Sequence, residues 1–234
     1  TYLINESISS LERRLGSEGF IRVHRSYLVN LEDVHNVEVG STGLMELRLD
    51  RVSSTVPVSR RRAAEVKAMI GVSPQETAVA PNLTVRENLE LICGIHGFSR
   101  EKRERKTAEL SAQFGLDALS GKRAGKLSGG WQRRLSIAMA LIGEPQILFL
   151  DEPTLGLDVL ARSDLRDVIR ALKGKITIIL TTHYMEEAEA LSDRIGIMKD
   201  GKLLTVGTAA ELKQHAGKER FEEAFIAIVK GDAT

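Results

Sequence analysis

The sequence has 234 residues, of which 42% are hydrophobic and 28% are charged, a composition typical of folded globular proteins and unlike that of disordered or fibrous ones. The 33 Lys and Arg residues nearly balance the 32 Asp and Glu residues. The overall charge therefore favours neither nucleic acid nor an anionic membrane as a partner, and any basic site must be local. One cysteine, Cys93, cannot form an internal disulfide, which fits a reducing cytosol. No apolar run approaches the roughly 18 residues that span a bilayer, so any role at a membrane is expected from the water side.

The first part of the chain, up to about residue 62, has short and alternating patterns. A helix is predicted from roughly Ser9 to Leu15, opened by the capping-box spacing of Ser9 and Glu12. Four runs at strand period follow: FIRVHRSYLVN, VHNVEVG, LMELRLD and STVPVS. GSTG, between the second and third runs, is typical of a hairpin turn. This part is therefore predicted to be small and mostly β.

From about Ile70 onward, longer helical patterns alternate with short, wholly apolar strands, ILFL at 147–150 and ITIIL at 176–180. Strands without polar alternation are buried on both faces, which indicates an α/β fold with a parallel sheet covered by helices. A helical subdomain is predicted at about residues 82–140. The seam falls in the helical stretch RRRAAEVKAMIG, and we place one domain at residues 1–66 and the other at 67–234.

Two acids and a histidine follow these apolar strands. Asp151 and Glu152 end the first strand, and His183 comes directly after the second. Open parallel sheets bind ligands at the carboxyl ends of their strands, and adjacent carboxylates there suit one metal-bound phosphate and one activated water. Taken singly, such acids often cap the next helix, and a lone histidine is usually structural. Their order and spacing together favour a phosphate site.

A third feature is the helix start LSGGWQRRL at residues 127–135. A serine hydroxyl and bare backbone N–H groups at the start of a helix make an anion site. The phosphate loop GxxxxGK[ST], however, does not occur upstream. The nearest string, GKRAGKLS at 121–128, has one residue too few between its glycines and follows no strand.

Three stretches resemble, in order and spacing, the Q-loop, signature motif, Walker B, D-loop and H-loop of ATP-binding cassette (ABC) ATPases: GVSPQE, LSGGWQRRLSIAMALIGEPQILFLDEPTLGLD and TTHYMEEAEALSDRIGIMKDGKLLTVGT. The resemblance covers about residues 65–230. The stretch GTAAELKQHAGKERFEEAFIAIVKG is similar to the branch that powers two-component bacterial exporters of drugs, antibiotics or polysaccharides. In that family two cassettes enclose two ATP molecules, and the signature of each closes over the nucleotide held by the other.

The resemblance implies the cofactors ATP and Mg²⁺ and a role for each matching residue. Gln75 would sense magnesium and the attacking water, and Asp151 would bind the metal through water. Glu152 would be the general base, and His183 would contact the γ-phosphate.

Other matching residues would act across a dimer of cassettes. The signature residues Ser128, Gly129, Gly130 and Gln132 would bind phosphate in the site of the partner. Asp158, in the D-loop, would also work across the dimer. The resemblance therefore implies a second cassette, in a homo- or heterodimer.

The first part resembles a different family, on the strings SISSLERRL, FIRVHRSYLVN and VPVSRRRAAEVK at about residues 2–68. These are similar to the LytTR DNA-binding domain of bacterial response regulators, a mostly β fold that reads the major groove through loops. The base-edge contacts would be His24 and Arg25, and the phosphate contacts Arg60, Arg61 and Arg62. The residues alone allow another interpretation, in which RRR is a solvated helix face and His24 holds a local turn.

Each part lacks the beginning of its family's pattern: the ABC part has no adenine-stacking aromatic and no Walker A loop, and the LytTR part lacks opening strands. Two accounts are open. The chain is a fusion in which the first strands replace the lost start of the cassette, or it is a piece of a longer chain.

We predict an ABC-transporter ATP-binding subunit, in which ATP hydrolysis drives export through a membrane permease and a Walker A loop comes from elsewhere. It would be cytoplasmic and peripheral, at the inner face of the cell membrane. The rival function is that of a LytTR-type transcription regulator that binds DNA through residues 1–66. A third alternative is a degenerate chain that only folds against a partner.

Overall fold

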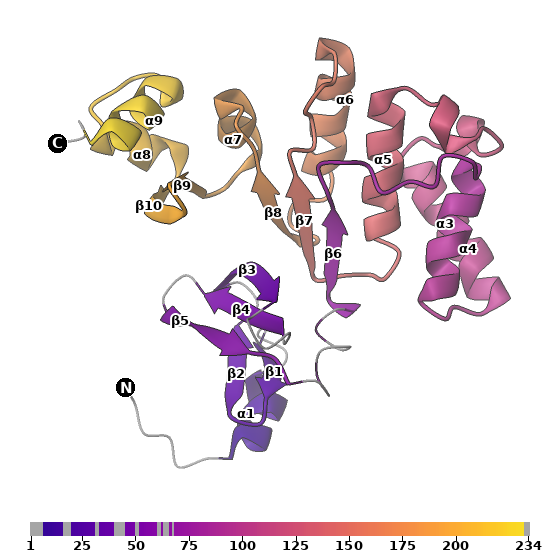
Figure 1. Ribbon diagram of the computed structural model, residues 1–234, viewed down its shortest axis with the longest axis horizontal. Helices are drawn as coiled ribbons and strands as arrows, with labels where there is room; N and C mark the ends of the chain where they lie inside the picture. The colour runs from indigo at the N-terminus through magenta and orange to yellow at the C-terminus, as the bar shows by residue number, and fades with distance from the viewer. Residues whose placement is uncertain are drawn as a thin grey trace.

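The computed structural model describes residues 7–15, 20–30, 33–39, 45–49, 52–59, 62, 66 and 68–231. The elements up to residue 57 are α1 (Ile8–Leu15), β1 (Phe20–His24), β2 (Tyr27–Asn30), β3 (Val34–Val39), β4 (Met45–Leu49) and β5 (Val52–Pro57). Strands β1 and β2 form one antiparallel pair, and β3, β4 and β5 form an antiparallel sheet in chain order (Figure 1). The prediction of a small, mostly β first part is confirmed.

The run FIRVHRSYLVN is not one strand but a hairpin. Arg25 and Ser26 form its turn, and Arg22 pairs with Leu28 across it. Pairing of Val39 with Met45 joins β3 to β4 in the way that a hairpin requires. The GSTG turn predicted there lies outside the described residues.

The predicted capping box at the start of α1 is wrong. Ser7, two residues earlier, is the capping side chain, and its hydroxyl accepts a hydrogen bond from the backbone N–H of Ser10 at 3.2 Å. Ser9 and Glu12 therefore lie within the helix, and their side chains are free to reach other elements.

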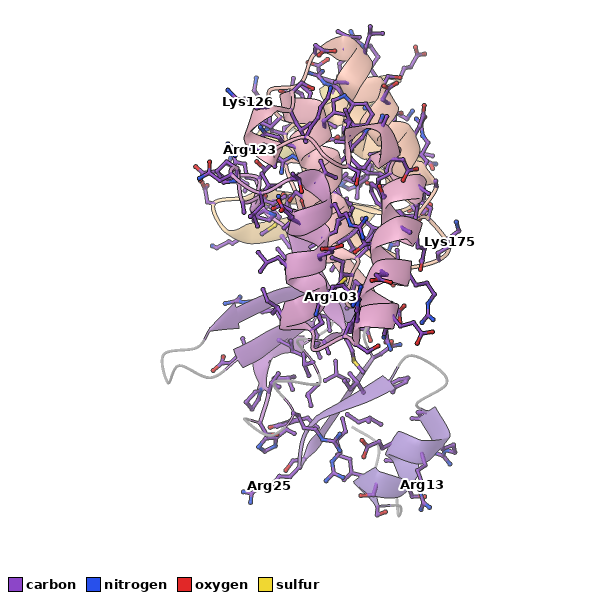
Figure 2. The ribbon with its side chains drawn as sticks, turned by 90° about the vertical axis from the view of Figure 1, so that its right-hand side faces the viewer. Arg13, Arg25, Arg103, Arg123, Lys126 and Lys175 are labelled. Atoms are coloured by element: carbon purple, nitrogen blue, oxygen red, sulfur yellow. The ribbon has the colours of Figure 1, made fainter. Side chains whose placement is uncertain are left out.

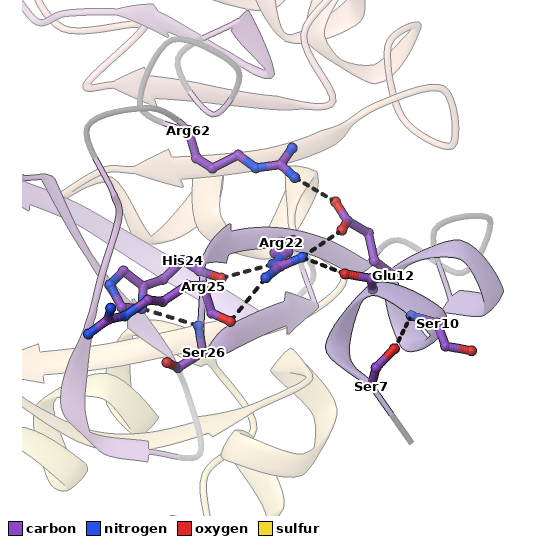
Figure 3. A network of polar contacts seen from close by, with 9 residues as sticks. Ser7, Ser10, Glu12, Arg22, His24, Arg25, Ser26 and Arg62 are labelled. Carbon is purple, nitrogen blue, oxygen red and sulfur yellow. Dashed lines mark hydrogen bonds and ion pairs between the residues drawn. The ribbon is translucent and has the colours of Figure 1, made fainter. Parts of the chain in front are cut away.

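Arg22 and Arg62 meet these two α1 side chains (Figure 3). Arg22 Nη1 donates to Ser9 Oγ at 2.9 Å and lies 3.5 Å from a carboxylate oxygen of Glu12. The other oxygen of Glu12 accepts from Arg62 at 3.1 Å. Glu12 thus joins α1 to β1 and to the segment that follows β5.

The remaining elements form the α/β part of the fold. They are β6 (Ile70–Ser73), α3 (Val85–Ile95), α4 (Arg100–Gln113), the 3₁₀ turns η3 (Asp117–Leu119) and η4 (Ala124–Lys126), α5 (Gly129–Ala140), β7 (Ile147–Asp151), α6 (Val159–Arg170), β8 (Thr177–Thr181), α7 (Met185–Leu191), β9 (Ile195–Lys199), β10 (Lys202–Gly207), α8 (Ala209–His215) and α9 (Phe221–Lys230). Strands β6, β7 and β8 form a parallel sheet in that order. The predicted α/β fold with a parallel sheet is confirmed.

Helices α3, α4 and α5 lie together on one side of this sheet, where the helical subdomain is expected (Figure 1). Their core includes Leu89, Leu110 and Leu135, all at most 2% exposed. Thr84 starts α3 with a full capping box, in which the carboxylate of Glu87 accepts from the Thr84 N–H and the Glu87 N–H donates back to the Thr84 hydroxyl. Within the described part of the chain, no helix combines the length and the apolar composition needed to cross a membrane.

The two apolar strands differ in burial. The residues of β7 up to Leu150 are buried or half-buried, as predicted for ILFL, because β7 is paired on both sides. The expectation that ITIIL is buried on both faces is wrong: in β8 no residue is fully buried. Among the described strands β8 lies at the edge of its sheet, and β9 and β10 pair only with each other over a separate core with α8 and α9.

The first strands pack on a face of the parallel sheet. Ile147 and Phe149 of β7 share one apolar core with Val23 of β1 and Leu47 of β4. Val66, at the predicted domain boundary, is 1% exposed in the same core. In the described residues the first part therefore covers the sheet without adding a strand to it.

Candidate functional site

The candidate site lies at the carboxyl ends of β7 and β8. Asp151, the last residue of β7, pairs with Thr181, the last residue of β8. The Thr181 hydroxyl donates a hydrogen bond to the Asp151 carboxylate, and the N–H of Glu152 donates to the Thr181 carbonyl at 3.1 Å. The parallel register therefore brings together the two strand ends that the sequence pattern singled out.

Glu152 and His183 approach each other directly in front of these strand ends. Glu152 Oε2 lies 2.8 Å from His183 Nδ1, which is an ion pair when the imidazole is protonated. The contact lacks hydrogen-bond geometry, and Oε2 is a buried oxygen without a hydrogen-bond donor among the described residues. The side chain of His183 is 56% exposed and that of Glu152 only 19%, so the imidazole is the more accessible of the two groups.

Glu152 also has an unusual backbone. Its φ of 46° is in the left-handed region, which a residue with a long side chain rarely adopts. Residues held in such conformations cluster at functional sites, where the surrounding structure compensates their cost of about 1–3 kcal/mol. Here the Glu152 N–H donates to the Thr181 carbonyl, and this hydrogen bond fixes Glu152 at a sharp bend directly after β7.

The start of α5 is open, as the LSGG pattern predicted. Ser128 is its N-cap residue, but the Ser128 side chain makes no capping hydrogen bond. A Cβ on Gly130 would meet the Cβ of Ala161 at 3.0 Å, so glycine lets α5 approach the start of α6 closely. Asp158 caps α6 by accepting the Ala161 N–H at 2.9 Å, a structural role that the sequence analysis did not assign to it.

The side chain of Gln132 points back to the η4 turn that precedes α5. Its side-chain amide donates to the carbonyls of Ala124 and Leu127, both at 3.2 Å. Gln75 is exposed after β6, and its carbonyl accepts from the guanidinium of Arg133. The sequence pattern gave no sign of the roles of Arg133 and Thr181, because their contacts join residues that lie about 60 and 30 positions apart.

The donor set fits nucleotide phosphates and Mg²⁺ in part. No three His, Cys, Asp or Glu side chains converge to hold a metal ion in the region that the structure describes. Mg²⁺ commonly takes only one or two carboxylates together with phosphate and water oxygens, which Asp151 can satisfy.

The residues assigned to DNA form a separate site at the β1–β2 turn. His24 Nδ1 accepts the N–H of Ser26 at 3.3 Å, so this imidazole does hold a local turn. Arg22 donates to the carbonyls of His24 and Arg25 at 3.2 and 3.1 Å, and these two hydrogen bonds stabilise the turn (Figure 3). Arg60 and Arg61 lie outside the described residues.

Arg25 is exposed at the tip of this turn. Figure 2 shows Arg25 at the opposite end of the molecule from Arg123 and Lys126, which stand at the η4 turn before α5. Arg62 is not a free cation, because its guanidinium is paired with Glu12.

Solved structures with this architecture define the class of fold. An ATP-binding subunit of an ABC transporter has a TM-score of 0.63, with 24% sequence identity, over 75% of this chain and 77% of that chain. The protein cbiO1 from Clostridium perfringens, part of the ABC transporter complex cbiONQ, also has a TM-score of 0.63 and 24% identity, over 70% of both chains. At this identity the likeness shows the fold alone, that of ABC ATPase domains.

Family models and curated relatives identify the family. The ABC transporter family matches residues 41–155, and the LytTr DNA-binding domain matches residues 1–71. The daunorubicin resistance ATP-binding protein DrrA3 of Streptomyces coeruleorubidus is 39% identical over 81% of this chain and 64% of its own length. ABC transporter A family member 11 of Arabidopsis thaliana is 42% identical over 77% of this chain and 18% of its own length.

Most of the chain is therefore similar to ABC-transporter ATP-binding proteins, and its first 71 residues are similar to the LytTr DNA-binding domain, with the two matches overlapping at residues 41–71. The family is one of nucleotide-binding domains. This chain spans less than two thirds of the length of these curated relatives. Both resemblances in the sequence are thus confirmed at the level of the family.

Proposed function

We propose that this chain forms the ATP-binding half-site of an exporter, in which ATP hydrolysis is coupled to transport through a membrane permease. The observation that carries the proposal is the joint placement of Asp151, Glu152 and His183 at two adjacent strand ends. Relatives with names such as the doxorubicin resistance ATP-binding protein DrrA of Mycobacterium tuberculosis support a role in export.

Each residue at this site has a proposed role. Asp151, held by Thr181, would orient a hydrated Mg²⁺ that neutralises phosphate charge. Glu152 would take the proton of the attacking water as general base. His183, which is exposed beside it, would contact the terminal phosphate, and Gln75 would sense the metal and the water.

A second cassette is part of the proposal. The open start of α5, with Ser128 and Gly129, would meet the phosphates held by that partner, whose phosphate loop would complete a composite site. Beside Asp158, the side chains of Val159 and Leu160 are 79% and 77% exposed, which suits burial against another protein. A permease would hold the pair at the inner face of the membrane. The residues of the site all lie in the proposed domain at 67–234.

The test pairs this chain with an intact ABC cassette that has its own phosphate loop. Nucleotide-dependent association, measured by analytical ultracentrifugation, and Mg²⁺-dependent ATP hydrolysis by the pair are expected. A matched pair with Asp151→Asn should associate but hydrolyse ATP slowly, because the carboxylate that orients the metal is removed. Absence of both association and turnover would overturn the proposal.

We also propose a second function, DNA binding by residues 1–66, on the match to the LytTr family and the exposure of Arg25. Arg25 stands on a turn that Arg22 and His24 hold rigid, as a base contact requires. A salt-dependent shift of a DNA probe, without any association with a cassette, would favour this function over the first.

A further inference from the structure

The segment that follows β6 is held against α5 by side chains of that helix. Ser136 Oγ lies 3.0 Å from Ser73 Oγ in a buried hydrogen bond. Gln132 accepts the hydroxyl of Thr77 at 3.5 Å. Between these two contacts Arg133 reaches the segment from the same face of the helix.

Arg133 makes the strongest of the three attachments. One guanidinium nitrogen donates to the carbonyl of Pro74 and the other to the carbonyl of Gln75, each at 2.5 Å. The residue is only 5% exposed. A planar fork of donors matches two consecutive carbonyls, whereas a buried cation without such acceptors would be strongly unfavourable.

The charge of Arg133 also reaches the strand end. Burial lowers the pKa of the Arg133 guanidinium, and the negative charge of Asp151 opposes that lowering. Arginine stays protonated in proteins, so this side chain is a permanent positive charge between α5 and the end of β7. It therefore ties the Gln75 segment to the signature helix by hydrogen bonds and interacts favourably with the charge of Asp151.

We propose that Arg133 is a positioning residue that fixes the backbone of the Gln75 segment on α5. Loop and helix would then move as one unit. If the proposed function holds, α5 faces the partner's nucleotide while Gln75 senses metal and water in this chain's own site. Arg133 would then couple the position of α5 to the position of Gln75. We propose that Arg133 acts through the backbone of this segment and not by contact with nucleotide or metal.

The first experiment uses the chain alone and does not depend on ATP hydrolysis. Backbone ¹⁵N relaxation should show the amides of Gln75 and Glu76 ordered in the wild type, with order parameters near about 0.85, and loosened to below about 0.6 in Arg133→Met. Arg133→Lys, which keeps the charge but not the fork, should restore part of the order. Arg134→Met is the matched control, since Arg134 stacks on Trp131 from the same helix.

The proposal is overturned if Arg133→Met leaves Gln75 and Glu76 as ordered as in the wild type. It is equally overturned if β6 and α5 loosen with them, or if Arg134→Met has the same effect, because Arg133 would then only support the fold.

A second measurement tests the consequence in a pair with an intact cassette. Arg133→Met should lower kcat about tenfold and change the KM for ATP by less than about twofold, because Gln75 would be misplaced for chemistry and not for binding. An unchanged kcat would overturn the positioning role. An inactive wild-type pair would instead refute the proposed function, and the relaxation data would still decide the role of Arg133.

Discussion

Glu152 and His183 face each other at the ends of two neighbouring parallel strands, with 2.8 Å between the carboxylate oxygen Oε2 and the imidazole nitrogen Nδ1. Glu152 is the proposed general base, and its carboxylate lies beside the imidazole that is proposed to contact the terminal phosphate. This pair is the centre of the proposed chemistry.

Glu152→Gln is expected to lower ATP hydrolysis by the pair with an intact cassette about 10²- to 10⁴-fold, since the amide keeps the shape of the side chain but cannot accept a proton. Nucleotide-dependent association should survive. Steady-state phosphate release measures the effect, and Glu219→Gln, at an exposed position, is the control. Equal turnover in wild type and Glu152→Gln would show that Glu152 is not the base.

Ser128→Arg in this chain should stop the site of the partner, because a long cation would fill the open start of α5 where a phosphate is expected. Ser128→Ala should retain most activity, since the backbone N–H groups remain. The unpaired chain should bind ATP weakly, because its sequence supplies no lysine-bearing phosphate loop. Micromolar, Mg²⁺-dependent binding of labelled ATP by the unpaired chain would contradict this prediction.

Arg25→Ala should weaken DNA binding, since Arg25 is exposed at the tip of a rigid turn. His24→Ala should relax sequence preference by loosening that turn. Arg13→Ala, on the exposed face of α1, is the control and should change affinity little. Fluorescence anisotropy across salt concentrations measures these effects, and if Arg25 binds a phosphate, its replacement would reduce the salt slope by about 1. No binding even at low salt would remove this function.

Gly71→Ala should destabilise the fold by about 1–3 kcal/mol, because the new Cβ would lie 2.5 Å from the carbonyl oxygen of Ala140 and 2.9 Å from Pro145. Gly94→Ala is the control: Gly94 lies in α3, nothing apart from the adjacent backbone of that helix lies within 4 Å of the new Cβ, and the change should stabilise the fold by about 0.5–1 kcal/mol. Urea unfolding measures both. A neutral Gly71→Ala would mean that β6 and α5 can separate at no cost.

The ion pair between Lys106 and Glu144 should make the stability of the fold depend on pH in the acid range. The hydrogen bond and charge of Lys106 hold the pKa of Glu144 below the ordinary 4.5. A lowered folded-state pKa adds stability above the unfolded value, and that stability is lost as pH falls through the folded value. The stability lost in Lys106→Met should therefore be present at pH 7 and shrink below about pH 4.5.

The magnitude should be small, about 0.2–1 kcal/mol, because the Glu144 side chain is 61% exposed and screened by solvent. Thermal melts from pH 7 to about pH 3 measure it, with Lys175→Met at an exposed position as the control. A difference that stays constant across this range would show that the ion pair adds nothing.

Two features of the fold were predicted correctly from short stretches of sequence. ILFL became the central strand β7 and LSGG became the open start of α5, because both depend on a few adjacent residues. The exposure of β8 could not be read in the same way, since ITIIL carries no information about how many strands lie beside it. A wholly apolar run indicates a parallel sheet, and the order of strands decides how much of it is covered.

Side chains with distant partners were the least predictable. Glu12 has the spacing of a capping box with Ser9, yet its carboxylate is taken by Arg22 and Arg62. Arg133 lies in a helix pattern that shows nothing of Gln75, 58 residues away. Such contacts arise only when elements far apart in sequence are packed together.

The core shared by the first strands and the parallel sheet bears on how this chain could be cut or recombined. Val23 and Leu47 cover Ile147 and Phe149, so each part shields apolar surface of the other. Replacing the first part by an unrelated module would leave that face wet and prone to aggregation. Limited proteolysis near Val66 should release sticky fragments and not two independently soluble domains, and heat should melt both parts in one transition.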